Sequence, residues 1–271
     1  MGLRINTNVA ALNAGRILRG STKELNTSLE RLASGLRINS AKDDAAGLGI
    51  AEGFRSVVLG SNVAQRNAQD GVSLVQTAEG SLSETTNILQ RVRELAVQSA
   101  NGTQSTSNRA ALDNEVQQLL AQIDDIAFDT EFNGIRVLSS AQTVTLQTGT
   151  RDSQTLAIAV TGAATSDLGI SAVTISSLNS AVSALSTLDT AIQSVTTLRS
   201  TLGAYQNRLE FTINTLAIQE ENSAAAESAI RDADIARETI AFTRNQILVT
   251  AGTSVLAQAN LVPQTALSLL G

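Results

Sequence analysis

The chain contains a single proline, Pro263, among its 271 residues. Proline removes a backbone donor and clashes with the preceding turn, so it ends or kinks most helices. The 262 residues before it can therefore form helices much longer than the globular average. Hydrophobic residues make up 42% of the chain and aromatic residues only 2%, so the apolar surface is mostly Leu, Ile, Val and Ala. Such side chains favour helices packed on helices.

Leucines in the first part of the chain repeat at the spacing of a coiled-coil seam. They are Leu18, Leu25, Leu29, Leu32 and Leu36. The spacing predicts a first helix that begins near Thr7. At Gly35 this helix should break, and a second helix should begin with Ser40 as its N-cap and Asp43 at the capping-box position.

Helical spacing returns in three further stretches, which predict helices at 43–100, 104–130 and 178–229. A last helix is expected from about residue 232 to residue 260. Between them, apolar and polar residues alternate, and this alternation predicts a β-hairpin within 135–170, the only convincing strand region. The expected fold is therefore mainly α, a long antiparallel helical bundle or coiled coil with one small β-hairpin.

Both terminal segments combine Ala, Leu, Ile and Val with small polar residues, but each has too narrow an apolar face to fold alone. Isolated helices are marginally stable without packing. We therefore expect both ends to be loosely ordered in the monomer and to fold when neighbouring subunits bury them.

Composition argues against an enzyme. The chain has no Cys and no His, which removes the usual nucleophile pairs, general bases, metal ligands and disulfides. The net charge of −6 gives no attraction for nucleic acid. No apolar run is long enough to span a bilayer, and residues 1–6 lack the hydrophobic block of a secretory signal. We expect no cofactor and no metal, and an export route without a cleaved signal peptide.

Adjacent acidic residues offer the remaining candidates for metal binding or acid–base chemistry. Asp43 and Asp44 lie at an expected helix start, where carboxylates cap free N–H groups, so capping is the favoured interpretation. The acidic pairs at 124–125 and 220–221 cannot share one helix face, and a solvated surface is favoured for both.

Several blocks of sequence occur in the order typical of one family. They are Leu3-Arg4-Ile5-Asn6-Thr7-Asn8, the stretch from Ser34 to Ala46, Gln69-Asp70-Gly71, Gln90-Arg91-Val92-Arg93-Glu94-Leu95-Ala96-Val97-Gln98, Phe132-Asn133-Gly134, Ala251-Gly252-Thr253-Ser254-Val255-Leu256-Ala257-Gln258-Ala259-Asn260 and Val262-Pro263-Gln264. Each block alone is weak, but together they cover nearly the whole chain. The sequence resembles the bacterial flagellins.

This resemblance implies three parts, with the terminal helices paired into an inner coiled coil. Residues 1–42 would form an N-terminal inner-tube helix and a connecting spoke, 43–229 the rod, and 230–271 a C-terminal inner-tube helix. The hinge or spoke residues would be Gly35, Asn39, Asp43 and Asp44. The residues implied in inner-tube assembly are Leu18, Leu25, Leu29, Leu32, Ile247, Leu248, Val255, Leu256 and Leu261. The fourth helix is expected to follow the hairpin almost at once, so the resemblance implies a short form without variable outer domains.

The resemblance also implies the function, a structural subunit that polymerises into the extracellular flagellar filament for swimming motility. The implied partners are further copies of the chain, an export chaperone, the export apparatus, and cap and junction proteins. The alternatives are a hook–filament junction protein and another coiled-coil assembly protein.

The segment at 90–98 resembles the stretch of flagellins that a vertebrate Toll-like receptor recognises. Arg91 and Leu95 on this helix and Glu115 on the next lie at the matching positions. The alternative, favoured for the biological role, is that these residues mainly form contacts between subunits in the filament, with receptor binding incidental.

Overall fold

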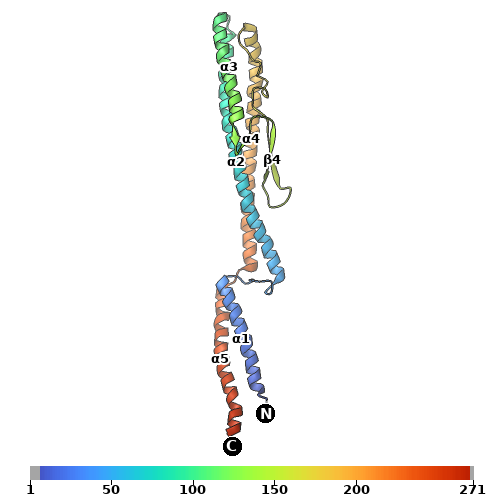
Figure 1. Ribbon diagram of the computed structural model, residues 1–271, viewed down its shortest axis with the longest axis vertical. Coiled ribbons are helices and arrows are strands. Elements are labelled where there is room, and N and C mark those ends of the chain that lie inside the picture. The colour runs from blue at the N-terminus through green and yellow to red at the C-terminus, as the bar shows by residue number, and fades with distance from the viewer. Residues whose placement is uncertain (1–6, 269–271) are drawn as a thin grey trace. The chain divides into compact units, whose positions relative to one another are not determined.

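The computed structural model describes residues 7–268, with side chains to residue 261, and it confirms the expected mainly α fold. The helices are α1 (Val9–Ser34), α2 (Ala45–Ser99), α3 (Thr106–Asp129), α4 (Leu178–Arg231) and α5 (Ile235–Ser268). The strands are β1 (Glu131–Phe132), β2 (Ile135–Arg136), β3 (Gln142–Gln147) and β4 (Thr155–Val160) (Figure 1). None of the described helices combines the length and apolarity needed to cross a membrane.

The chain divides into two compact units, one of residues 1–57 with 222–271 and one of residues 58–221. The divisions lie inside α2 and α4, because both helices continue across them. The domain boundaries expected from the sequence, after residues 42 and 229, lie instead near breaks between helices. The division into tube and rod remains a prediction.

The unit of residues 58–221 contains the apolar core. In it α3 returns antiparallel to α2, and α4 packs beside them (Figure 1). Buried side chains recur every seven residues on both long helices, as a coiled-coil seam requires. They are Ala68, Val75, Leu82, Leu89 and Ala96 on α2, and Leu188, Val195, Leu202, Leu209 and Leu216 on α4.

The hairpin of β3 and β4 lies against this core. The two strands are antiparallel, and Val144 faces Ile158 in the register. Inward residues of β4 are fully or almost fully buried, whereas the alternate residues are exposed, as predicted by the period-two pattern. Gly71 of α2 allows this packing, since a Cβ there would lie 2.2 Å from Leu146 Cδ1 of β3.

The end of the third helix differs from the sequence prediction. The helix buries Val116, Leu120, Ile123 and Ala127, and Leu112 and Leu119 pack partly buried against the same core. It ends at Asp129, and a second antiparallel strand pair, β1 and β2, follows. The turn between these strands uses Asn133 (φ 50°) and Gly134 (φ 77°), a conformation that Asn-Gly favours.

The unit at the chain ends consists mainly of α1 and α5, which pack on each other. Asn8 caps α1, since its side chain accepts a hydrogen bond from Ala11 N, and Gly35 ends it with φ 72°. The last helix is longer than predicted, because it continues through Pro263 to Ser268. The only apolar side chains buried in the described part of this unit are Ile38 and Ala51.

Candidate assembly surfaces

The α1–α5 pair is held by a seam and by polar contacts along its length. Asn8 Nδ2 donates a hydrogen bond to the carbonyl of Ala259 (2.7 Å), and Arg31 lies 3.8 Å from Glu238. Between these contacts Gly252 allows close approach, because a Cβ there would lie 3.2 Å from Leu18 Cδ1. The helices are therefore antiparallel, with the start of α1 beside the later part of α5.

The residues expected in inner-tube assembly fall into two groups. Leu18, Leu25, Leu32 and Leu256 are half-buried and belong to the intrachain seam side. Leu29, Ile247, Leu248, Val255 and Leu261 are exposed. The four exposed C-terminal residues and Ile240, which is also exposed, form what we call the α5 stripe: Ile240, Ile247, Leu248, Val255 and Leu261.

The connecting loop between α1 and α2 is tied to the junction of α4 and α5. Arg37 N donates to the carbonyl of Arg231 (2.7 Å), and Ala233 N donates to the carbonyl of Gly35 (2.9 Å). The Arg231 side chain, almost buried, forms ion pairs with Glu52 (3.0 Å) and Glu227 (3.7 Å). The expected hinge residues thus lie in or beside a loop with fixed backbone partners.

The capping prediction for this loop is half wrong. Asp43 Oδ2 accepts from Ser40 N and Ser40 Oγ (both 3.0 Å), but no helix begins at Ser40. Instead Asp44 Oδ1 accepts from Gly47 N (2.8 Å) at the start of α2. Helix α2 begins later because residues 40–43 form a closed turn. The pKa of Asp43 is lowered, mainly by the hydrogen bond from Ser40 N. The Ser40 hydroxyl, Asn39 N and the charge of Lys42 lower it further, and together these effects outweigh desolvation.

Of the three residues expected to contact an innate receptor, two, Arg91 and Glu115, have exposed side chains. Arg91 on α2 donates to Glu115 Oε1 on α3 through Nε (3.2 Å) and Nη2 (2.9 Å), and also pairs with Glu94 (3.2 Å). The hydrogen bond to Glu115 raises the pKa of Arg91 most, and the hydrogen bond to Glu94 raises it further. Leu95 does not fit the expected role in a surface contact. Its side chain is 1% exposed, because it lies on the core face of α2.

Two more arginines join α2 to α4 across the surface of the bundle. Arg93 Nε donates to Asp189 Oδ1 (2.7 Å), and this hydrogen bond raises the pKa of Arg93. Arg199 Nη2 donates to Glu79 Oε1 (2.6 Å). Such exposed pairs fix the register of the helices more than they stabilise them.

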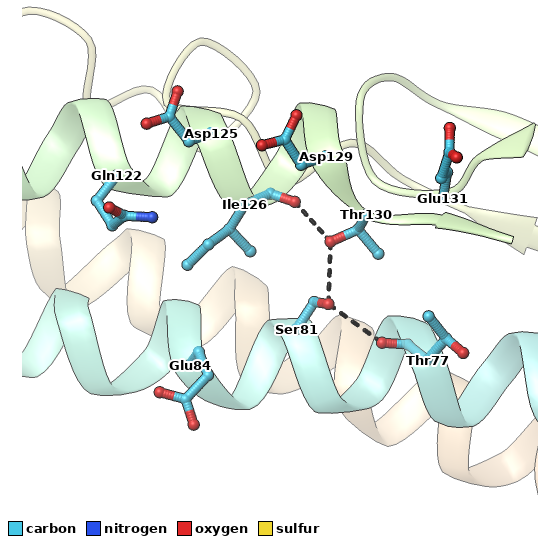
Figure 2. Close-up of a pocket in the computed structure, with 9 residues that line it drawn as sticks. All are labelled: Thr77, Ser81, Glu84, Gln122, Asp125, Ile126, Asp129, Thr130 and Glu131. Atoms are coloured by element: carbon cyan, nitrogen blue, oxygen red, sulfur yellow. Dashed lines mark hydrogen bonds between the residues drawn. The ribbon is translucent and has the colours of Figure 1, made fainter. Parts of the chain in front are cut away.

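A hollow of about 400 Å³ lies between α2 and the end of α3 (Figure 2). Ser81 Oγ donates to the carbonyl of Thr77 (3.2 Å), and Thr130 Oγ1 lies 2.9 Å from Ser81 Oγ and 2.5 Å from the carbonyl oxygen of Ile126. The remaining lining residues are Glu84, Gln122, Asp125, Asp129 and Glu131. In the described part of the chain no group of three or more His, Cys, Asp or Glu residues is arranged to hold a metal ion. The hydroxyl chain joins two helices and offers no reactive centre.

Acidic residues interpreted as solvated in the sequence have structural partners. Asp124 Oδ1 and Oδ2 accept from Thr165 N (2.8 Å) and Thr165 Oγ1 (2.9 Å). Three turns earlier on α3, Asp113 Oδ1 accepts from Ile175 N (2.6 Å). The two carboxylates hold the loop between β4 and α4. The solvated interpretation of Asp124 is therefore wrong, since this loop covers it.

Glu220 was also expected to be solvated. Its carboxylate accepts from Asn62 Nδ2 and Gln65 Nε2, both at 2.8 Å. Helix α2 lies beside this face of α4, which the sequence of α4 alone does not reveal. The sequence signal for this contact was the pair of amide side chains three residues apart on α2, Asn62 and Gln65. Amides at that spacing are also common on solvated helices, so the signal was not specific.

Two family models match the chain at its two ends. The bacterial flagellin N-terminal helical region matches residues 5–143, and the bacterial flagellin C-terminal helical region matches residues 185–270. The chain belongs to the bacterial flagellin family.

Full-length relatives agree with this membership. A flagellin of Halalkalibacterium halodurans is 45% identical over 269 residues, which cover 98% of this chain and 99% of the relative. A flagellar filament 33 kDa core protein of Treponema phagedenis is 44% identical over 283 residues and covers the same shares. Among solved structures, a flagellar hook-associated protein of Vibrio parahaemolyticus has a TM-score of 0.55 at 10% identity, with 70% of this chain and 98% of that chain covered. That likeness supports the fold alone.

This flagellin is therefore a structural subunit of the flagellar filament and not an enzyme. Its relatives support polymerisation of the chain with itself and a place outside the cell, in the filament. The alternative of a hook–filament junction protein is not favoured, because the full-length matches are to flagellins and filament core proteins. The length and the short connection between β4 and α4 agree with a core-only form.

Proposed function

We propose that the α1–α5 pair forms the inner tube of the filament and that the α5 stripe is covered by neighbouring subunits there. The observation that carries this proposal is the exposure of large aliphatic side chains on a helix whose other face already packs on α1. Ile247 is 63% exposed, and Val255 and Leu261 are exposed to a similar extent. A contiguous exposed apolar surface of this kind marks an interaction site.

Assembly by this surface couples subunit addition to ordering of the chain ends. The α1–α5 pair buries almost no apolar side chain of its own, so most of its stabilisation is gained when a second copy covers it. The α5 stripe and the surface that covers it are different patches, so the contact is heterologous and repeats by one screw operation without closing.

The same stripe is the proposed binding site of an export chaperone before assembly. A partner that covers Ile247 and Val255 in the cytoplasm would prevent premature polymerisation, because it occupies the surface that copies of the chain need. Passage through the export apparatus to cap and junction proteins at the growing tip would then expose the stripe where it is used.

Seeded polymerisation tests the proposal. Purified subunits are added to short filament fragments, and growth is followed by light scattering and electron microscopy. The unsubstituted chain is expected to elongate the fragments without limit, and variants that lack residues 1–30 or 240–271 are expected to add nothing. Circular dichroism of the same variants checks that helices of residues 58–221 remain. Elongation by either truncated chain contradicts the inner-tube assignment.

We also propose that Arg91 and Glu115 form part of a contact with a vertebrate Toll-like receptor. Both side chains are exposed and joined across α2 and α3, so they present one charged surface. Arginine is a frequent interface anchor. In a binding assay with monomer, Arg91→Ala is expected to weaken receptor binding, and Arg93→Ala serves as the matched control on the same helix. Equal binding by Arg91→Ala and the unsubstituted monomer contradicts this proposal.

A further inference from the structure

The chain contains two Asn-Gly sequences, and the structure holds them in different conformations. Asn133-Gly134 forms the two-residue turn between β1 and β2, where Asn133 has φ 50°. Asn101-Gly102 lies in the exposed loop between α2 and α3, where Asn101 has an ordinary, negative φ. Glycine has no side chain to shield its backbone nitrogen, so in this dipeptide the nitrogen can attack the side-chain amide of the preceding asparagine. The local backbone decides how readily it does so.

The Asn101 side chain is folded over the Gly102 nitrogen. Asn101 Oδ1 accepts a hydrogen bond from Thr103 N (3.2 Å), and this bond closes a small ring that contains both Asn101 Cγ and Gly102 N. In the described part of the chain Gly102 N donates no hydrogen bond, and a Cβ built on Gly102 would meet nothing within 4 Å. The attacking nitrogen and the amide carbon are therefore held near each other without obstruction, and such proximity speeds intramolecular reactions.

Two groups of the same loop stabilise the charge that this attack creates. Asn101 Oδ1 becomes negative as the nitrogen adds to Cγ, and Thr103 N already donates to this oxygen. Arg109 holds its guanidinium at the loop, since Nε donates to the carbonyl of Ser99 (2.9 Å) and Nη2 to the carbonyl of Asn101 (3.0 Å). Asp113, one turn later on α3, accepts from Ile175 N through Oδ1. The positive charge of Arg109 therefore favours the negative intermediate and a carboxylate at position 101.

The turn at Asn133 opposes the same attack. Asn133 and Gly134 both have positive φ, as in the type I′ turn of a two-residue hairpin. In this left-handed backbone the side chain and the next nitrogen lie on opposite sides of the Cα–C bond. Bringing them together would unpair β1 from β2, whereas at Asn101 it costs exposed hydrogen bonds to the carbonyl of that residue. The fold therefore slows one Asn-Gly sequence and not the other.

We propose that Asn101 is a site of spontaneous covalent modification, at which the loop converts its own asparagine into aspartate and isoaspartate. Gly102 N loses its proton to water and bonds to Asn101 Cγ, and the Cγ–Nδ2 bond breaks as Nδ2 takes up a proton and leaves as ammonia. Water then opens the five-membered imide. Breaking the bond at Cγ gives aspartate, and breaking the bond at the backbone carbonyl gives isoaspartate. The sum consumes water and releases ammonia, with no change of oxidation state.

Conversion changes both the charge and the backbone of the α2–α3 loop. A negative charge appears beside Arg109, which gains an ionic partner. Isoaspartate also adds a carbon atom to the backbone at the point where the chain reverses. Because the reaction needs only water and time, its extent increases with the age of the subunit.

Mass spectrometry of tryptic peptides tests the proposal on the full-length monomer. Trypsin cleaves after Arg93, Arg109 and Arg136, so the two Asn-Gly sequences fall in separate peptides, 94–109 and 110–136. Monomer is aged at neutral pH in water enriched in heavy oxygen, which labels only the molecules that convert during the incubation. Asn101 is expected to convert about tenfold faster than Asn133 in the folded chain. In concentrated urea the two should convert at similar rates.

Two substitutions at position 103 test the assigned donor. Thr103→Pro removes the N–H that bonds to Asn101 Oδ1, and Thr103→Ala keeps it. Each rate is divided by the rate of the same variant in urea, which removes the effect of the new neighbour on the chemistry itself. The normalised rate at Asn101 should fall about tenfold in Thr103→Pro and stay unchanged in Thr103→Ala.

The rate ratio of Asn101 to Asn133 in the folded chain decides the outcome. A ratio near one or below it overturns the proposal, as does a ratio that is the same in urea. Equal slowing by Thr103→Pro and Thr103→Ala, or slowing by neither, also overturns it, because the backbone donor would then play no part. Thermal unfolding of each variant checks that the helices are intact.

Discussion

Replacement of Ile247 by alanine separates stability of the monomer from stability of the filament. The change removes about three methylene-sized groups, worth about 2.4 kcal/mol on complete transfer from water. Ile247 is already 63% exposed in the monomer, so about 1.5 kcal/mol of that transfer remains for assembly. If neighbours cover the side chain fully, the critical concentration for elongation should rise about tenfold. Monomer unfolding should change by no more than the part already buried in the monomer, about 0.9 kcal/mol.

The matched control is Leu82→Ala in the core of residues 58–221. Leu82 is fully buried, so its truncation should cost about 2–5 kcal/mol of the free energy of unfolding of the monomer. It should leave the critical concentration nearly unchanged well below the melting temperature. Urea unfolding of monomers and pelleting of filaments at a series of concentrations measure the two quantities. A critical concentration that responds equally to both substitutions refutes the reasoning, because filament growth would then follow monomer stability and not a covered surface.

Three further outcomes follow from the connecting elements. Asp124→Ala should cost about 1–3 kcal/mol in urea unfolding and speed hydrogen exchange at Thr165, whose backbone N–H loses its acceptor. Gly47→Ala should destabilise the monomer by about 1 kcal/mol, the usual cost of a lost cap, although alanine is the better helix former. The new Cβ would lie 2.4 Å from the Asp44 carboxylate, which caps α2, and would displace it. A neutral or stabilising change in urea unfolding would show that the cap is not displaced. The pKa of Asp43 is lowered on folding, so its contribution is complete above about pH 4 and is lost as the pH falls through the folded pKa. The stability difference between Asp43→Asn and the unsubstituted chain should therefore shrink on acidification, as measured by urea unfolding at a series of pH values, and a constant difference would contradict the assigned hydrogen bonds.

Much of the fold was predictable because long helices carry a strong periodic signal. The predicted helix at 43–100 lies within two residues of α2 at both ends, and the switch to alternation located β4. Short elements were harder to predict from the sequence. The β1–β2 pair has only two residues in each strand, too few for a period to be visible, and its Asn-Gly turn falls between the predicted third helix and the predicted hairpin.

The candidate surfaces were predictable only in part, because spacing identifies an apolar position but not what covers it. Leu95 and Arg91 occupy one helical segment, and burial of the first became evident only when the core face of α2 was known. Phe211 on α4, which is 73% exposed, was not singled out in the sequence for the same reason. It interrupts no pattern, and its exposure depends on which face of α4 meets α2.

The two units of this flagellin differ in how much of their apolar surface is buried within one chain. Residues 58–221 complete a core within one chain, whereas the α1–α5 pair leaves all of its described apolar side chains at least partly exposed. Its remaining aliphatic surface can be removed from water only by other copies. Elongation must then carry a negative heat-capacity change, the signature of apolar burial and ordering on binding. Because hydrophobic stabilisation weakens on cooling, filaments should lose subunits from their ends at low temperature while the core of residues 58–221 stays folded.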